Sequence, residues 1–100
     1  MNAQSLIVTA QIKAKPGREA QVRELLLSLV EPSRKDTGCL HYDLYQGRDN
    51  PALFLFHENW LSRELLDQHL QKPHVTLVLD PLGELVAEPP QIALWEQIGP

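Results

Sequence analysis

The fold is decided by residues 39–60, CLHYDLYQGRDNPALFLFHENW, which hold two strand-like segments and the turn between them. Cys39 to Gln46 alternates apolar and polar side chains, and Ala52 to Trp60 is rich in Phe and Leu, as expected for strands. The intervening Gly47-Arg48-Asp49-Asn50-Pro51 has the length and composition of a hairpin loop. A parallel connection needs a crossover of a dozen or more residues, so this short turn predicts an antiparallel pair.

A strand and a helix precede this hairpin. Leu6 to Lys15 is predicted to be a strand, because β-branched and apolar residues dominate it. Lys15-Pro16-Gly17 ends this strand with residues typical of turns. Arg18 to about Ser33 is predicted to be a helix that ends before Gly38, whose backbone is permissive. The helix carries one apolar stripe, formed by Val22, Leu25, Leu26, Leu29 and Val30.

Two short helices and a last strand are expected after the hairpin. Ser62 is a good N-cap for a helix from Arg63 to about Gln71. Pro73 begins a second helix, to about Leu79, because proline is favoured in a first helical turn. Asp80-Pro81-Leu82-Gly83 is expected to interrupt that helix. After Pro89-Pro90, the segment from Gln91 to Ile98 is predicted to be a strand.

The predicted order is therefore β-α-β-β-α-β over a single domain, residues 1–100. It predicts an α+β, ferredoxin-like fold, with an antiparallel four-stranded sheet and helices on one face. A parallel α/β sheet is the disfavoured alternative, because the hairpin turn is too short for it.

Apolar residues occupy both faces of the predicted strands. In the third strand, Phe54 and Phe56 lie on one face, and Leu53 and Leu55 lie on the other. In the first strand, Ile7 points away from the face that holds Leu6, Val8, Ala10 and Ile12. Helices cover only one face in this fold. We therefore expect a second copy of the chain to cover the other face, in a homodimer.

Composition excludes several classes of protein. The 100 residues include one cysteine, so an internal disulfide is impossible and a cysteine-rich zinc site is excluded. The net charge is −4 and the basic residues are scattered, which argues against nucleic acid as a partner. There is no apolar run long enough to cross a membrane, and residues 1–5 do not resemble a signal peptide. We expect a cytoplasmic protein.

The densest group of candidate functional residues lies in the third strand. Its period of two places Phe54, Phe56, Glu58 and Trp60 on one face. If Glu58 is buried among these aromatic side chains without a cation, its pKa should rise. Two roles remain open for Glu58, an acid–base group or a structural anchor, and Trp60 is either core or a platform for a substrate.

The histidines that follow are also candidates. His69 lies on an apolar helix stripe and is either a satisfied core residue or a base that titrates near neutral pH. His74 either lines the same cavity or lies on the surface. No metal site is expected, because the spacing of His57, Glu58, His69 and His74 matches no metal motif. The isolated glycines give no nucleotide-binding loop, and we expect Cys39 to serve in packing.

The ordered set of these features resembles the antibiotic biosynthesis monooxygenase (ABM) domain family, including its quinol monooxygenase branch. The resemblance covers nearly the whole chain. It begins with the first strand and Lys15-Pro16-Gly17, and continues through Gly38-Cys39-Leu40-His41-Tyr42-Asp43-Leu44. Its most specific part is Phe-x-x-x-Glu-x-Trp, here Phe54, Glu58 and Trp60, followed by Ser62, His69 and Pro73-His74.

This resemblance implies a dimeric α/β barrel with a pocket in each protomer between sheet and helices. Some members oxidise quinols or polycyclic phenols with O₂ and no cofactor, because a phenolate can itself give an electron to O₂. Small aromatic substrates and O₂ are the implied ligands. Phe54, Phe56 and Trp60 would form aromatic walls, and Glu58 or His69 would move the proton.

Departures from the family's patterns argue against oxygenation of anthrone-type polyketides and against haem degradation. Polyketide-modifying members have an Asn four residues before the Trp, where this chain has Phe56, and haem-degrading members have an Asn in the first strand, where this chain has none. An isomerase of a small carbonyl compound and a non-catalytic dimer that binds a small ligand are the alternatives. A phosphorylated substrate would need cations near the pocket, and the available ones are Arg34, Lys35, Arg48, Arg63 and Lys72.

Overall fold

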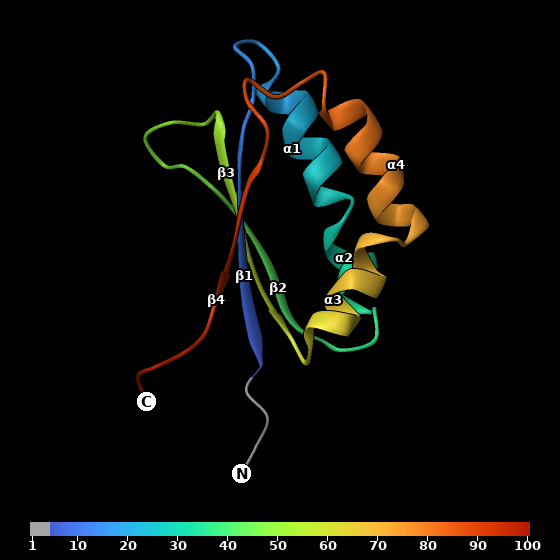
Figure 1. The fold of residues 1–100 in the computed structure, drawn as a ribbon. Coiled ribbons are helices and arrows are strands. Elements are labelled where there is room, and N and C mark those ends of the chain that lie inside the picture. The colour runs from blue at the N-terminus through green and yellow to red at the C-terminus, as the bar shows by residue number, and fades with distance from the viewer. Residues whose placement is uncertain (1–4) are drawn as a thin grey trace.

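A computed structural model describes residues 5–100; the first four residues of the segment compared above with a signal peptide lie outside the described part. The elements within it are β1 (Leu6–Lys13), α1 (Glu19–Leu27), α2 (Val30–Arg34), β2 (Cys39–Gln46), β3 (Leu53–Trp60), α3 (Arg63–Leu70), α4 (Pro73–Leu82) and β4 (Gln91–Trp95). The predicted order is confirmed, with each helical segment divided into two helices (Figure 1).

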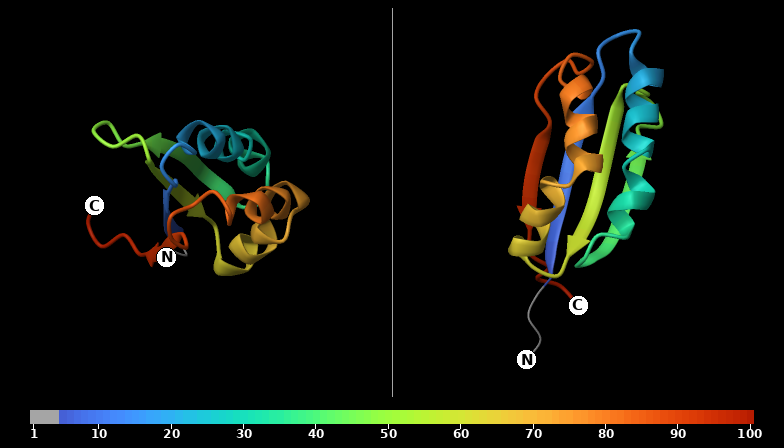
Figure 2. Two further views of the ribbon diagram at one scale, coloured as in Figure 1. Left: turned by 90° about the horizontal axis from the view of Figure 1, so that it is seen from above. Right: turned by 90° about the vertical axis from the view of Figure 1, so that its right-hand side faces the viewer.

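The four strands form one sheet in the order β2-β3-β1-β4, and all neighbouring strands are antiparallel. β1 and β3 occupy the centre, and the helices all pack on one face of the sheet (Figures 1 and 2). This is the predicted ferredoxin-like α+β fold. The hairpin between β2 and β3 is antiparallel, as the short turn requires.

The core lies between the sheet and the helices. Strand alternation turns Val8, Ala10 and Ile12 of β1 inward, where they are all buried. Phe54, Phe56, Glu58 and Trp60 of β3 point the same way and are also buried, so the predicted common face is confirmed. The helices contribute apolar side chains to this core, among them Val22, Leu26, Leu66, Val75 and Leu82.

The expected single helix from Arg18 to Ser33 is wrong, because the chain divides near Ser28. Pro32 has no backbone N–H to bond the carbonyl of Ser28, and its ring disfavours the helical position of that carbonyl. The Ser28 hydroxyl instead donates to the carbonyl of Leu25 at 2.6 Å. α1 ends at Leu27, and α2 then leads the chain toward Asp36.

The helix that begins at Pro73 is longer than expected. It continues through Pro81 to Leu82, so the predicted interruption at Asp80 is wrong. Proline costs little there, because the helix ends one residue later and a single backbone bond is lost. The buried Leu82 side chain holds this last turn against the core. The last strand ends at Trp95 rather than at Ile98.

Gly38 fixes the loop between α2 and β2 against α3. Its φ of +87° is in the left-handed region, and a Cβ there would lie 2.5 Å from Cδ1 of Leu65. The carbonyl of Gly38 accepts a 2.9 Å hydrogen bond from the N–H of Leu61. Ser62 is the N-cap of α3, as predicted, and its hydroxyl accepts from the N–H of Leu65 at 3.2 Å. This packing brings Asp36 close to the end of α3.

Candidate active site

A cavity of about 130 Å³ lies between the inner face of the sheet and the helices. Of its described lining residues, three carry polar side-chain atoms: Tyr42 of β2, Glu58 of β3 and His69 of α3. The others are Val8, Ala10, Ile12, Leu26, Leu29, Phe56, Leu66, Leu70, Val75, Leu79, Leu82, Pro90 and Ile92. Apolar cavities of roughly 150 Å³ accept a benzene molecule, so this space matches one aromatic ring.

The cavity reaches the surface beside β4. Leu70, Leu79 and Ile92 line it and are themselves 42%, 48% and 63% exposed. These three side chains therefore form an apolar mouth through which a ligand can enter.

Glu58 is a buried carboxyl group at the inner end of the cavity. Glu58 is only 6% exposed, and Nε1 of Trp60 donates a 2.9 Å hydrogen bond to Oε1 of Glu58. Burial raises the pKa of Glu58 from 4.5 to about 7, although the bond from Trp60 acts in the opposite direction. The sequence-based expectation of a raised pKa is confirmed. Glu58 therefore exchanges protons near neutral pH.

His69 is a buried imidazole on the last turn of α3, only 3% exposed. Its ring lies 4.5 Å from the ring of Trp60 and 5.6 Å from that of Tyr42, measured between centroids. Burial lowers the pKa of His69, and the hydrogen bond with Asp36 partly opposes this shift. His69 is therefore neutral at neutral pH, which is the state that can accept a proton.

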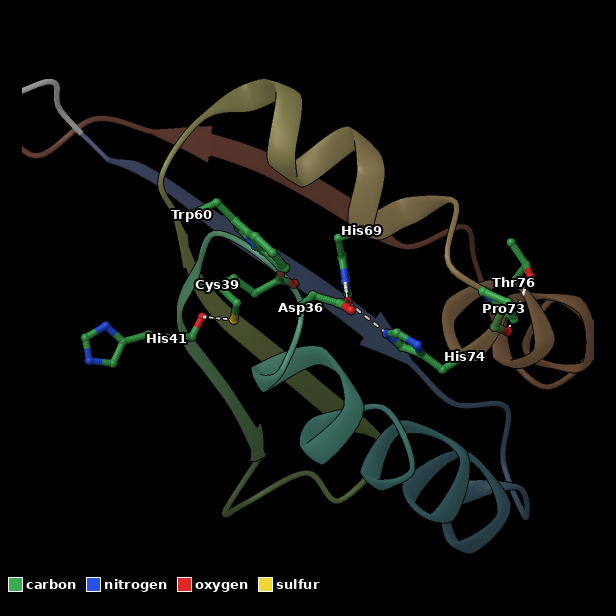
Figure 3. A network of polar contacts seen from close by, with 9 residues as sticks. Asp36, Cys39, His41, Trp60, His69, Pro73, His74 and Thr76 are labelled. Atoms are coloured by element: carbon green, nitrogen blue, oxygen red, sulfur yellow. Dashed lines mark hydrogen bonds and ion pairs between the residues drawn. The ribbon is translucent and has the colours of Figure 1, made fainter.

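Asp36 joins the two candidate histidines (Figure 3). Its Oδ2 lies 2.7 Å from Nδ1 of His69 and 2.9 Å from Nε2 of His74. The Asp36 and His69 side chains are almost fully buried, whereas that of His74 is 24% exposed. The cluster thus extends from the cavity-lining His69 toward solvent at His74.

Two histidines and a carboxylate are also a familiar set of metal ligands, and the fold brings them together although their spacing matches no motif. Their spacing in the sequence did not reveal this cluster, which forms only through the tertiary fold. The separations nevertheless fit hydrogen bonds better than shared ligation. Two ligands bound at about 2.0–2.1 Å to a tetrahedral ion stand roughly 3.3 Å apart, wider than 2.7 and 2.9 Å.

The other predicted site residues lie in different places. Phe56 lines the cavity, whereas the buried Phe54 does not. Trp60 is fully buried behind the cavity, where it contacts Glu58 and His69 rather than forming a wall. His74 does not line the cavity and instead reaches Asp36. Cys39 is half-buried, and burial raises the pKa of its thiol to about 11, so it is a poor nucleophile.

Tyr42 and Asp36 are the site residues that the sequence did not single out. Tyr42 pairs across the sheet with Glu58, beyond a bulge between Cys39 and His41 that alternation alone does not reveal. Asp36 lies in a turn after a helix, where an Asp usually makes only local bonds. Gly38, two residues after Asp36, can adopt a left-handed backbone, and it was the one sign in the sequence of a tight turn here.

The arrangement can bind a flat apolar ring and move a proton beside it. Apolar side chains exclude water, and Glu58 and His69 supply two titratable groups on the same cavity. A dry cavity strengthens their electrostatic effect on a bound phenol or enol. Proton transfer to or from an aromatic or conjugated small molecule is therefore the chemistry that this geometry allows.

The family model described as "Antibiotic biosynthesis monooxygenase" matches residues 5–78, which is most of the chain. The chain belongs to this ABM family. The match includes β1, the β2–β3 hairpin, α3 and the three residues of the Asp36 cluster. Membership in the ABM family supports a monooxygenase-like function.

Individual proteins resemble the chain in sequence and in structure. The ABM chain is 37% identical over 82 residues to "Putative monooxygenase Rv0793" of Mycobacterium tuberculosis, covering 82% of this chain and 80% of that protein. It is 32% identical over 91 residues to the uncharacterized protein sll1783 of Synechocystis, covering 91% of this chain but 62% of that protein. The crystal structure of PA3566 from Pseudomonas aeruginosa superposes with a TM-score of 0.93, at 29% identity and 99% coverage of both chains.

Among the helices of residues 5–100, none has the length and apolar character needed to cross a membrane.

Proposed function

We propose that this protein is a monooxygenase that oxygenates a single-ring quinol or a related phenol with O₂, without a bound metal, flavin or haem. One observation carries the proposal: an apolar cavity of one-ring size has Glu58 and His69 on its wall, each with a pKa shifted by burial. Membership in the ABM family supports the same reaction class.

The first task of such an enzyme is to deprotonate the substrate. A phenol reacts slowly with O₂, but its phenolate is electron-rich and can pass an electron to O₂. His69 is neutral near pH 7 and acts as the base that takes the phenolic proton. Glu58, whose pKa is about 7, returns a proton later in the reaction. The apolar lining holds the ring and keeps water away from the intermediate.

The reaction balances without a separate reductant. A hydroquinone and O₂ give a hydroxyquinone and water: one oxygen atom enters the ring at a C–H position, and the other leaves as water. The hydroquinone supplies all four electrons that reduce O₂, since it is hydroxylated and is also oxidised to the quinone. The protein provides only binding, orientation and proton transfer.

Cavity size favours single-ring substrates. The volume of about 130 Å³ is close to that of cavities that hold one benzene ring, so a fused second ring has to lie at the mouth beside Ile92. Phosphorylated substrates are disfavoured, because no Lys or Arg is among the described lining residues. This observation weakens the alternative of an isomerase acting on a phosphorylated carbonyl compound.

We also propose that the active form is a homodimer in the cytoplasm. The sheet face opposite the helices is bare in one chain (Figure 1) and carries exposed Tyr45, Leu55 and Trp95. Tyr45 and Leu55 are directly paired across β2 and β3, so they form a contiguous patch. A second copy of the chain is the simplest cover for such a face, and the two sheets then form the barrel.

Oxygen uptake with hydroquinone in chelator-treated buffer tests the proposed reaction. With ¹⁸O₂, we expect one labelled oxygen atom in the hydroxyquinone product and the other in water. Uptake that requires added iron or flavin contradicts the proposal, as does oxidation to the unlabelled quinone alone. Conversion of a carbonyl substrate without O₂ uptake indicates the isomerase. Binding of aromatic ligands with no turnover indicates a non-catalytic binding protein.

A further inference from the structure

We propose that Asp36 is a positioning residue that holds His69 in the tautomer with its proton on Nδ1, so that Nε2 is left bare as the base. His74 is the second donor to the same carboxylate oxygen and holds Asp36 in place. The inference rests on the proposed function only in calling His69 a base.

Both hydrogen bonds to Asp36 run in the same direction, from imidazole to carboxylate. An ionised carboxylate only accepts, so each imidazole must donate to Asp36. Nδ1 of His69 donates at 2.7 Å, and Nε2 of His74 donates at 2.9 Å, both to Oδ2 (Figure 3). A neutral imidazole has a single N–H. Because that of His69 is on Nδ1, its Nε2 carries a lone pair.

Nε2 is the ring nitrogen of His69 that Asp36 does not engage. This atom makes no hydrogen bond within residues 5–100, and it is not among the buried side-chain atoms that lack a partner there. His69 lines the cavity and is only 3% exposed, so what remains accessible of its ring lies mainly against the cavity. With Nδ1 bonded to Asp36, Nε2 is the ring nitrogen left to meet a ligand there.

Asp36 is held in place by the backbone of its own loop. Its backbone N–H donates to the carbonyl of Ser33 at 3.0 Å, and its carbonyl accepts from the N–H of Cys39 at 3.1 Å. The following Gly38 packs against Leu65 on the same helix as His69. The carboxylate is thus fixed to the fold before any ligand binds, which is what orientation of a base requires.

Proton transfer follows directly from this arrangement. The substrate O–H bond breaks, its electron pair stays on the phenolate oxygen, and the proton joins Nε2 of His69. His69 becomes an imidazolium whose Nδ1–H remains bonded to the charged carboxylate of Asp36. His74 shares that carboxylate, and its 24% exposed side chain connects the cluster to solvent. Asp36 touches no ligand and acts only through His69.

Long-range ¹H–¹⁵N NMR of the imidazole nitrogens tests the proposal in the wild-type protein without any assay. We expect His69 to carry its proton on Nδ1. In Asp36→Asn, we expect a mixture of His69 tautomers, because the neutral amide can donate a hydrogen bond as well as accept one. We expect kcat for hydroquinone to fall at least about tenfold with little change in KM, since base catalysis contributes roughly 10²–10⁴-fold. In His74→Gln, His69 should still carry its proton on Nδ1. The kcat of this variant should fall less than that of Asp36→Asn.

Asp67→Asn is the matched control. Asp67 has the same charge and lies on α3 two residues from His69, but within residues 5–100 it pairs only with the exposed Arg63, at 3.2 Å. We expect this variant to keep both the tautomer and kcat. A wild-type His69 protonated on Nε2 overturns the proposal, as does an Asp36→Asn protein with wild-type kcat. If no variant or wild type turns over quinol, the Nδ1–H tautomer still supports the positioning role, and only the proposed function fails.

Discussion

The indole Nε1 of Trp60 donates a 2.9 Å hydrogen bond to Oε1 of Glu58, two residues earlier on the same inward face of β3. Strand periodicity places both side chains in the core, where Trp60 is fully buried and Glu58 nearly so. Burial disfavours the charged carboxylate, and the indole N–H favours it. The balance puts the pKa of Glu58 at about 7, which suits proton exchange in the cell.

Replacing Trp60 by Phe should raise the pKa of Glu58 above 7. Phenylalanine keeps an aromatic ring at this position, but it lacks the indole N–H that stabilises the carboxylate. The folded state should also lose about 1–3 kcal/mol or more, because a buried acceptor is left without its donor. A ¹³C NMR titration of the Glu58 carboxyl group measures the first effect, and urea unfolding measures the second.

Trp95→Phe is the control for this variant. Trp95 is 55% exposed and donates to Oγ1 of Thr9 at 2.7 Å, on the face of the sheet opposite to Glu58. It should leave the Glu58 titration unchanged. Identical titrations in wild type and Trp60→Phe would mean that the indole does not control Glu58.

Glu58 should make stability depend on pH between about 4.5 and 7. In this range the unfolded chain has released the Glu58 proton and the folded chain still holds it, so stability falls as pH rises. Glu58→Gln stays neutral and avoids this loss. The variant should match wild type near pH 4.5 and exceed it by up to about 3 kcal/mol above pH 7.

The difference in unfolding free energy between wild type and Glu58→Gln isolates the contribution of the Glu58 carboxyl group. The lowered pKa of His69 has the opposite consequence, since stability is lost as pH falls below the usual imidazole value of 6.5. That contribution is shared by both proteins and cancels. A difference that does not change between pH 4.5 and 8 would show that Glu58 has an ordinary pKa.

Gly38→Ala should be more destabilising than Gly17→Ala. Both glycines have positive φ, +87° and +85°, so each substitution carries a backbone cost of roughly 1–2 kcal/mol. Only at Gly38 does the new Cβ meet a side chain, Cδ1 of Leu65 at 2.5 Å, whereas nothing lies within 4 Å at Gly17. Urea unfolding should show an extra cost of about 1–3 kcal/mol at Gly38. Equal costs would mean that the Asp36 loop is not packed against α3.

Leu55→Lys should convert a dimer into a monomer. Leu55 lies on the bare sheet face beside Tyr45, where a lysine would meet the second copy of the chain. Light scattering of wild type at low micromolar concentration should give twice the 11.4 kDa chain mass. Leu77→Lys, at a 71% exposed position on α4, should remain dimeric. A monomeric wild type would contradict the assignment of this face.

The sequence predicted the sheet well because its signals are local. The turn at 47–51 sets an antiparallel hairpin, and alternation puts Phe54, Phe56, Glu58 and Trp60 on one face. Helix ends were harder, because Pro32 breaks a regular apolar stripe while Pro81 is tolerated one residue before an end. Both outcomes depend on the position of the proline relative to the ends of its helix.

The sequence could predict only those site residues whose place follows from one strand or one helix. Glu58, Trp60 and His69 follow from strand and helix faces, and the raised pKa of Glu58 follows from its aromatic neighbours. The bond between Asp36 and His69 joins residues 33 positions apart through the packing of a loop. No local pattern encodes such a contact, so Asp36 becomes visible only in the folded chain.

The acid–base role of Glu58 and His69 is tested most directly by steady-state O₂ uptake with hydroquinone in metal-free buffer. Wild type, Glu58→Gln and His69→Ala should be compared at one pH near 7, with folding checked by circular dichroism. Both groups line the cavity, and each general acid or base contributes roughly 10²–10⁴-fold to the rate. We predict that each substitution lowers kcat by about 10²-fold or more. Wild-type rates of quinol oxidation in both variants would contradict the account.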